Sequence, residues 1–225
     1  HFTSQLPQIE SLADYSPSIP SKIFSKDGRL LAEIGREKRE VIEISSLPQV
    51  VIDSFLAAED DSFYEHRGVD YTGLMRAFWV NLKAGRVVQG GSTITQQVAK
   101  SLLLTRERSL SRKIKDFLLA QKIEERFTKE EILFLYLNQV YLGSSFYGVK
   151  AALNGYFGKD LDEITIAEAS MVAGLLVAPS KYSPMSNPEA AFKRQRYVLK
   201  RLLLTRKITE DEYKEALEEK IKFKI

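Results

Sequence analysis

Cysteine, clustered histidines and long apolar runs are all missing from this 225-residue sequence. Without cysteine, the chain can form no disulfide, no zinc–thiolate site and no cysteine nucleophile. Its two histidines argue against a metal site built from several imidazoles. No segment approaches the roughly 20 consecutive apolar residues that span a bilayer, and the first residues lack the pattern of a signal peptide.

The glycine motifs that hold nucleotide phosphates are missing as well. The 12 glycines form neither G-x-G-x-x-G nor G-x-x-x-x-G-K. Their absence argues against a nucleotide-sugar donor held by a Rossmann-type domain. Any anionic ligand must therefore be held by side chains.

Basic charge is concentrated in two parts of the chain. The net charge is only +3, but residues 81–115 carry eight basic residues and one acid, and residues 190–207 carry seven basic residues and no acid. This distribution suggests a polyanionic partner. The alternative is that both segments form solvated helix faces.

The hydrophobic content of 44% is sufficient for a full core, and the pattern along the chain predicts a mainly α-helical fold. We expect a domain organisation of an N-terminal coil and β-hairpin linker over 1–44 and a helical domain over 45–225. The hairpin or linker sheet is expected within 22–44, on both sides of Asp27-Gly28. Gly143 and Gly158 are expected to close helices, and Pro188 to open one. Capping boxes are expected at Thr128 with Glu131, Thr165 with Glu168 and Thr209 with Glu212.

The stretch EDDSFYEHRG (59–68) follows an apolar helical segment and begins with three acids. Glu59 should lie at the end of that helix, near the negative pole of its dipole and beside Phe63. Burial and the dipole both disfavour a carboxylate, so we expect a raised pKa and a better proton acceptor near neutral pH. The alternative is that the acids solvate a helix end and that His66 is a buried, hydrogen-bonded side chain.

Two further motifs carry polar and basic side chains. In GGSTITQQVAK, Thr93 with Gln96 should cap a helix on which Thr93, Gln97 and Lys100 share a polar face suited to sugar and phosphate oxygens. In the next motif, RERSLSRKIKD, basic residues at helical spacing should keep Asp116 ionised. An amphipathic surface and an ordinary surface salt bridge are the respective alternatives. Two carboxylates with separated proton affinities are typical of a sugar-transfer site.

With these motifs in order, the chain strongly resembles the peptidoglycan glycosyltransferase domain of class A penicillin-binding proteins and their monofunctional relatives. The motifs that carry the resemblance are EDDSFYEHRG, GGSTITQQ, RKIKD with the downstream Ala120 and Glu124, ILFLYLN (132–138) and APSKYSP with the VL that follows (178–199). The chain departs from the family pattern at Asp116 and Phe134, where the family usually has glutamate, and at Ser101, a common asparagine. Asp116 keeps the negative charge of glutamate on a shorter side chain. The residues of the ILFLYLN motif are interpreted mainly as packing residues.

The resemblance implies a lysozyme-like helical fold that polymerises lipid II into β-1,4-linked glycan strands, with inversion at the donor carbon and release of a polyprenyl diphosphate. Glu59 and Asp116 are the implied catalytic residues: Glu59 is the base for the acceptor hydroxyl, and Asp116 orients cations or holds a divalent ion. The implied substrate-binding residues are Thr93, Gln97, Lys100, Arg108 and Lys113. The implied supporting residues are Asp60, Phe63, His66, Ser92, Gln96 and Arg112.

The resemblance also implies partners and a location. The partners are lipid II, the growing glycan strand, the bacterial membrane surface and, in class A members, a C-terminal transpeptidase domain and other cell-wall synthesis proteins, with no nucleic acid. The location is the outer face of the cytoplasmic membrane, with an N-terminal transmembrane anchor outside this sequence. The fold itself would require no cofactor, although the family often responds to Mg²⁺ or Mn²⁺.

The segment GLMRAFWVNLKAG (73–85) suggests contact with a membrane. It places apolar residues, Phe78 and Trp79 among them, on a helix flanked by Arg76 and Lys83, a composition suited to the bilayer interface. Packing of these residues into the core is the alternative.

Two other classes of protein remain open from the residues alone. A lysozyme-type hydrolase would also use a glutamate with a raised pKa, but it needs an acid for a neutral leaving sugar and leaves the cations from Lys100 to Lys113 without a role. A nucleic-acid-binding helical module would use the basic charge but would leave Glu59 and the Ser/Thr/Gln motif without one.

Overall fold

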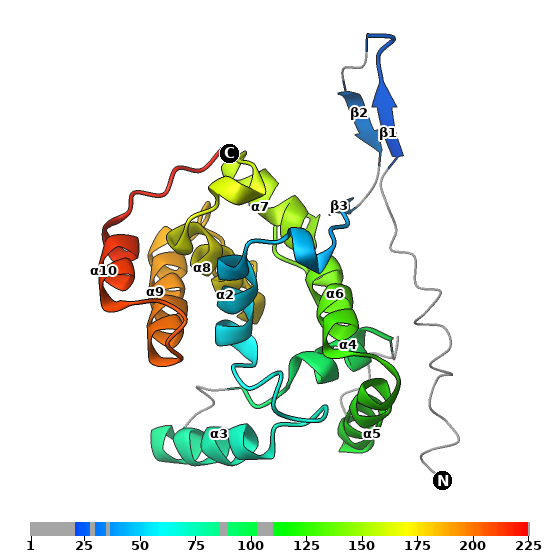
Figure 1. Cartoon of the computed structure of the whole chain (residues 1–225), viewed down its shortest axis with the longest axis vertical. Helices are drawn as coiled ribbons and strands as arrows, with labels where there is room; N and C mark the ends of the chain where they lie inside the picture. Colours follow the sequence, from blue (N-terminus) through cyan, green and yellow to red (C-terminus); the bar gives the residue numbers. More distant parts are fainter. Residues whose placement is uncertain (1–20, 28–29, 35–36, 86–89, 103–109, 225) are drawn as a thin grey trace. The chain divides into compact units, whose positions relative to one another are not determined.

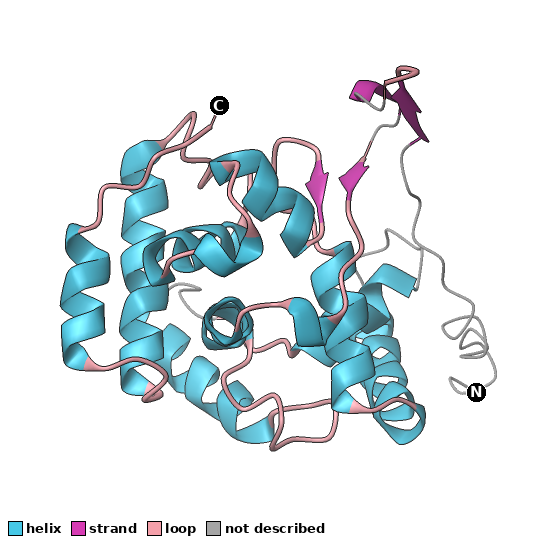
Figure 2. Ribbon diagram, turned by 45° about the horizontal axis from the view of Figure 1, so that its top comes forward, coloured by secondary structure: helices cyan, strands magenta, loops and turns pink. Residues whose placement is uncertain are grey.

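The structure, a computed structural model, describes residues 21–27, 30–34, 37–85, 90–102 and 110–224. Most of these residues are helical, and the strands among them are short (Figure 2). The mainly α fold expected from the sequence is therefore confirmed. The described residues fall into two compact units: a first unit over 59–136 and a second unit over 16–58 and 137–225. The domain boundary expected after residue 44 stays a prediction.

The first unit contains the segment that follows α2 and the next helices along the chain (Figure 1). Helix α4 packs against α5, and the buried side chains include Ile94, Val98 and Ile123. These apolar residues recur at helical spacing, so each helix buries one stripe. The helices are α3 (Tyr71–Ala84), α4 (Ile94–Leu102), α5 (Leu110–Arg126) and α6 (Lys129–Gln139), of which α6 contributes up to Tyr136.

In the second unit, three helices pack against one another at the C-terminal end of the chain (Figure 1). Ala167, Leu199 and Ala216, one from each helix, form a buried cluster. The helical elements of this unit are η2 (Ile44–Ser46), α2 (Gln49–Glu59, up to Ala58), α7 (Val149–Phe157), η3 (Leu161–Glu163), α8 (Ile166–Gly174), η4 (Leu175–Val177), α9 (Pro188–Leu204) and α10 (Glu210–Glu218).

The expected helix caps are present at every position but one. Reciprocal hydrogen bonds confirm all three capping boxes and the pairing of Thr93 with Gln96. Pro188 opens α9 after the cap residue Asn187, and Gly158 closes α7 in the left-handed conformation. The expectation for Gly143 is wrong, because α6 already ends at Gln139. Gly143, at φ 86°, instead forms a turn in which the Phe146 N–H donates to its carbonyl.

The hairpin expected within 22–44 is only partly correct. Strands β1 (Ser21–Phe24) and β2 (Leu30–Ile34) pair antiparallel, but β3 (Lys38–Arg39) pairs in parallel with β4 (Phe146–Tyr147). Residues 40–43 form no strand. A side chain takes the place of a neighbouring strand here. The Asn138 side-chain amide accepts a hydrogen bond from the Ile42 N–H and donates one to the Ile42 carbonyl. These are the backbone groups that a neighbouring strand would otherwise pair with.

Candidate active site

The first carboxylate of the site is held at a helix end, as expected. Glu59 is the last residue of α2 and is partly exposed, whereas residues 51–58 before it are buried. The Gln97 side-chain amide, on α4, donates a 2.7 Å hydrogen bond to Glu59 Oε2. The structure therefore brings together the first and second sequence motifs. The raised proton affinity of Glu59 stays a prediction.

The second carboxylate, Asp60, is 6% exposed and accepts hydrogen bonds from both motifs. His66 Nε2 lies 2.9 and 3.0 Å from its two oxygens, and the Ile94 backbone N–H donates to Oδ2 at 2.9 Å. Ile94 is the first residue of α4, where orphan N–H groups and the helix dipole favour negative charge. Asp60 thus connects the loop after α2 to the start of α4.

A glycine and a threonine complete this connection. Thr93 Oγ1 donates a 2.6 Å hydrogen bond to the Gly68 carbonyl. Gly68 has φ 81°, and a Cβ on it would lie 2.9 Å from the carbonyl oxygen of Ala120 on α5. Only glycine combines this backbone conformation with so close an approach to another backbone.

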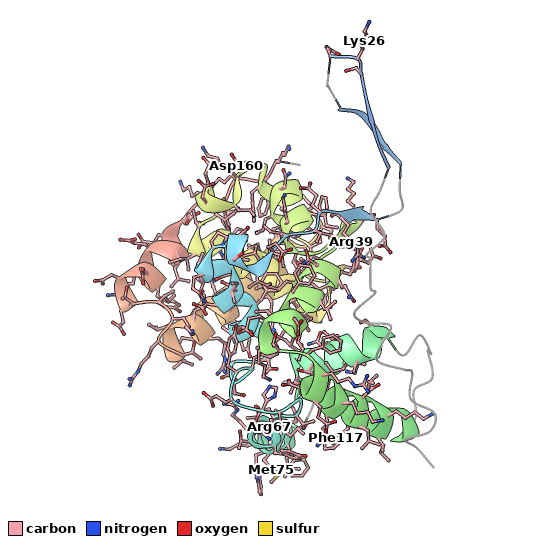
Figure 3. All side chains as sticks on the ribbon, turned by 45° about the vertical axis from the view of Figure 1, so that its right-hand side comes forward. Lys26, Arg39, Arg67, Met75, Phe117 and Asp160 are labelled. Atoms are coloured by element: carbon pink, nitrogen blue, oxygen red, sulfur yellow. The ribbon has the colours of Figure 1, made fainter. Side chains whose placement is uncertain are left out.

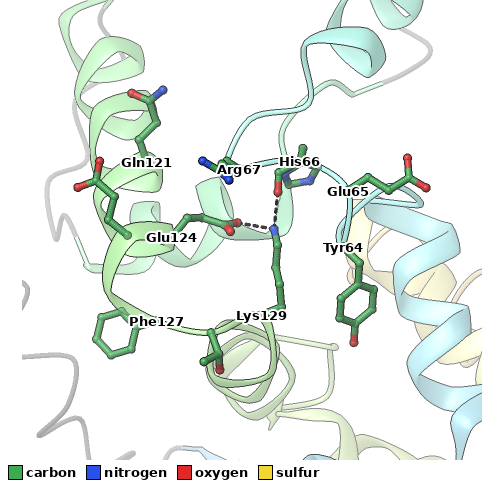
Figure 4. Close-up of a pocket in the computed structure, with 10 residues that line it drawn as sticks. Tyr64, Glu65, His66, Arg67, Gln121, Glu124, Phe127 and Lys129 are labelled. Carbon is green, nitrogen blue, oxygen red and sulfur yellow. Dashed lines mark hydrogen bonds and ion pairs between the residues drawn. The ribbon is translucent and has the colours of Figure 1, made fainter.

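Beside the loop lies an ion pair between Glu124, which belongs to the third sequence motif, and Lys129, which the sequence analysis did not single out (Figure 4). Lys129 Nζ donates to Glu124 Oε1 at 2.7 Å and to the His66 carbonyl at 2.8 Å, and it lies 4.4 Å from the centre of the Phe63 ring. Thr95 Oγ1 donates to the same Glu124 oxygen at 2.6 Å. His66, Glu124 and Lys129 border a cavity of about 640 Å³.

The cations expected around the site are only partly described. Lys100 Nζ, on α4, lies 3.3 Å from Ser92 Oγ, and Lys113 is exposed on α5. Arg108 lies outside the described residues, and so does the side chain of Arg112. Asp116 is 5% exposed on α5, one turn before the Ala120 carbonyl that contacts Gly68. The cationic surroundings expected for Asp116 therefore stay a prediction.

A metal centre finds no support in the described side chains. Within 21–27, 30–34, 37–85, 90–102 and 110–224, no three His, Asp or Glu residues are grouped so that they could hold an ion. Asp116 alone does not fit the oxygen-rich shell that Mg²⁺ or Mn²⁺ requires.

A buried phenol lies close to both carboxylates. Tyr136, on α6, is 4% exposed, and its hydroxyl has no hydrogen-bond partner. Burial, together with the negative charges of Glu59 and Asp60, holds the pKa of Tyr136 well above its usual value. Tyr136 therefore remains a neutral neighbour of the carboxylates across the physiological pH range.

The apolar residues of α3 lie on the protein surface. Phe78 is 57% and Trp79 61% exposed, and Met75 points outward from the helix (Figure 3). Only Gly73 and Ala77 of this helix are buried, so the core-packing alternative is wrong. None of the described helices is both long and apolar enough to cross a membrane.

Comparison with known protein families assigns the chain to one of them. The model of the Transglycosylase family matches residues 27–203, and the chain belongs to that family. The lysozyme-like helical fold expected from the sequence is thereby confirmed.

Similar proteins are penicillin-binding proteins 1A. The chain is 50% identical over 212 residues to the one from Aquifex aeolicus, covering 94% of this chain and 29% of that protein. It is 45% identical over 221 residues to the one from Pseudomonas aeruginosa, covering 98% and 27%. The crystal structure of penicillin-binding protein 1A from Haemophilus influenzae is similar with a TM-score of 0.53 at 27% identity, covering 93% of this chain and 22% of that one. The chain thus spans less than a third of the length of these relatives.

Proposed function

We propose that the chain is a peptidoglycan glycosyltransferase that polymerises lipid II into β-1,4-linked glycan strands. The observation that carries the proposal is the hydrogen bond from Gln97 to Glu59, which holds one carboxylate at the junction of the first two motifs. Membership of the Transglycosylase family supports the same reaction class.

In this proposal Glu59 is the general base. The acceptor's 4-hydroxyl loses its proton to the Glu59 carboxylate as its oxygen forms a bond to the anomeric carbon of the donor. The bond from that carbon to the diphosphate oxygen breaks on the opposite face, so an α-linked donor becomes a β-linked product. The electron pair leaves with the polyprenyl diphosphate.

Cationic side chains would stabilise the departing diphosphate, which is a good leaving group without a general acid. Lys100, Lys113 and Arg108 are assigned this role by their positions in the motifs. Lys100, in the last turn of α4, reaches back to Ser92, which precedes that helix. Thr93 and Gln97 would orient sugar or phosphate oxygens, and Asp116 would orient the cations.

Hydrogen bonds around Asp60 support a positioning role rather than proton transfer for the neighbouring residues. Asp60 is already engaged by His66 and by the Ile94 N–H. Phe63 is 1% exposed and contacts the His66 ring edge to face. In the proposal, Asp60, Phe63 and His66 therefore keep the loop that follows Glu59 in shape, and Gln96 does so for the start of α4.

The polymerisation of purified lipid II tests the proposal. Wild-type protein should form glycan strands, and Glu59→Gln should lose nearly all activity while still binding lipid II, because the amide cannot accept the proton. Glu125→Gln, on the exposed side of α5, is the matched control and should remain active. Hydrolysis of added glycan strands without polymerisation would instead identify a lysozyme-type hydrolase.

We also propose that the protein works at the outer face of the bacterial cytoplasmic membrane, where a lipid-linked donor resides. The exposed Phe78 and Trp79 would enter the interface between head groups and acyl chains. A transpeptidase domain and other cell-wall synthesis proteins are the proposed partners in the full-length protein, since the similar penicillin-binding proteins are more than three times as long as the chain.

A further inference from the structure

Among the described residues, the Lys129–Glu124 ion pair has contacts that the proposed chemistry does not use. We propose that Lys129 and Glu124 are positioning residues for Glu59 and Asp60, acting through the loop over 60–68 and the first turn of α4. This inference rests on the proposed glycosyltransferase function. It assigns a role to two residues to which the proposed chemistry gives none.

The pair closes a ring of hydrogen bonds around the loop. From the His66 carbonyl the ring runs through Lys129 Nζ and Glu124 Oε1 to Thr95 Oγ1. Along the α4 backbone it passes from Thr95 to the Ile94 N–H, then to Asp60 and back to His66. The loop is therefore held to α4 by two separate chains of hydrogen bonds. One passes through Asp60 and the other through the ion pair.

Burial and charge make the pair rigid. The Glu124 side chain is 8% exposed and that of Lys129 is 18% exposed. The Lys129 ammonium also lies over the Phe63 ring, whose electron-rich face attracts a cation. Charged hydrogen bonds shielded from water are stronger and less mobile than exposed ones.

Loss of the ion pair should displace the Glu59 carboxylate, because the change is transmitted through α4. Thr95 and Gln97 lie two residues apart in the first turns of that helix, and Gln97 holds Glu59. A shift of the helix start relative to the loop would change the position of the Glu59 carboxylate. Displacing a reacting group by about 1 Å typically costs about 100-fold in rate.

Chemical rescue offers a sharp test because the pair borders the cavity of about 640 Å³ (Figure 4). In Lys129→Ala, propylammonium supplies the three carbons and the nitrogen that the substitution removes. We expect kcat for lipid II polymerisation to fall about 10- to 100-fold with a much smaller change in KM, and propylammonium but not 1-propanol to restore part of it. Lys129→Arg, which keeps a cation, should lose less.

Lys159→Ala is the matched control, since Lys159 forms a 2.8 Å ion pair with Glu168, which is 1% exposed, in the second unit. Glu124→Gln is the second variant, to be used if Lys129→Ala does not fold. It removes the negative charge and keeps the volume of the side chain. The inference is overturned if folded Lys129→Ala or Glu124→Gln keeps wild-type kcat, or if 1-propanol rescues as well as propylammonium. A wild-type protein that forms no glycan strands would overturn the proposed function instead.

Discussion

The side-chain amide of Gln97 lies 2.7 Å from Glu59 Oε2 and donates a hydrogen bond to it. This bond joins the end of α2 to α4, so the carboxylate keeps one orientation. We expect Gln97→Ala to lower kcat for lipid II polymerisation about 10- to 100-fold, because the Glu59 side chain gains freedom to leave its reactive position. Initial rates of glycan-strand formation at saturating lipid II measure this loss of kcat. Gln121→Ala, on α5, is the control, and equal rates for the two variants would contradict the positioning role.

Of the three glycines Gly68, Gly85 and Gly90, Gly68 should tolerate alanine least. Gly68→Ala meets both a positive φ of 81° and the Ala120 carbonyl oxygen at 2.9 Å, so we expect a loss of about 2–4 kcal/mol in the free energy of unfolding. Gly85→Ala has φ 62° and open space, and it should cost about 1 kcal/mol. Gly90→Ala has open space at an ordinary φ and should change stability by less than about 0.5 kcal/mol. Urea denaturation of the three variants tests this order, which equal losses would refute.

Charged substitutions on α3 should weaken binding to membranes. We expect the double variant Phe78→Glu with Trp79→Glu to bind anionic lipid vesicles several-fold less than wild type, because both side chains are more than half exposed and would enter the interface. Sedimentation with vesicles measures the bound fraction. Leu204→Glu, at a residue 61% exposed on α9, is the control for added charge. Unchanged binding of the α3 variant would reject the membrane role.

Asp70 should stabilise α3 in a pH-dependent way. Its partial burial opposes the charge, but hydrogen bonds from the Gly73 N–H and from the Thr72 and Ser62 hydroxyls outweigh it and lower the pKa of Asp70 below its usual 3.8. The stabilisation is therefore present above pH 3.8 and is lost as the pH falls through the folded-state pKa.

The corresponding experiment compares wild type with Asp70→Ala in urea between pH 6 and pH 3. At pH 6 the variant should be less stable by about 1 kcal/mol, the usual value of an N-cap. The difference should shrink below about pH 4. A difference that stays constant over this range would show that the charge of Asp70 contributes nothing.

Several elements of the fold were predictable because their causes are local. Capping boxes such as Thr165 with Glu168 join residues three positions apart, and the end of α2 at Glu59 follows from the apolar run before it. The apolar composition of α3 is equally visible in the sequence, although two readings of it were possible. Exposure of Phe78 and Trp79 decided between core packing and a surface position.

By itself, the sequence determined the helical class, every expected helix cap except Gly143 and the order of motifs that identify the family, since each depends on residues near one another along the chain. Tertiary structure alone decided which distant partners meet: Asn138 with Ile42, Thr93 with Gly68, and Lys129 with His66. The physical reason is that these bonds satisfy buried or partly buried backbone groups, and which groups become buried depends on the path of the whole chain. Lys129 and Glu124 are only five positions apart, but the bond from the Lys129 ammonium to the His66 carbonyl depends on the folded loop.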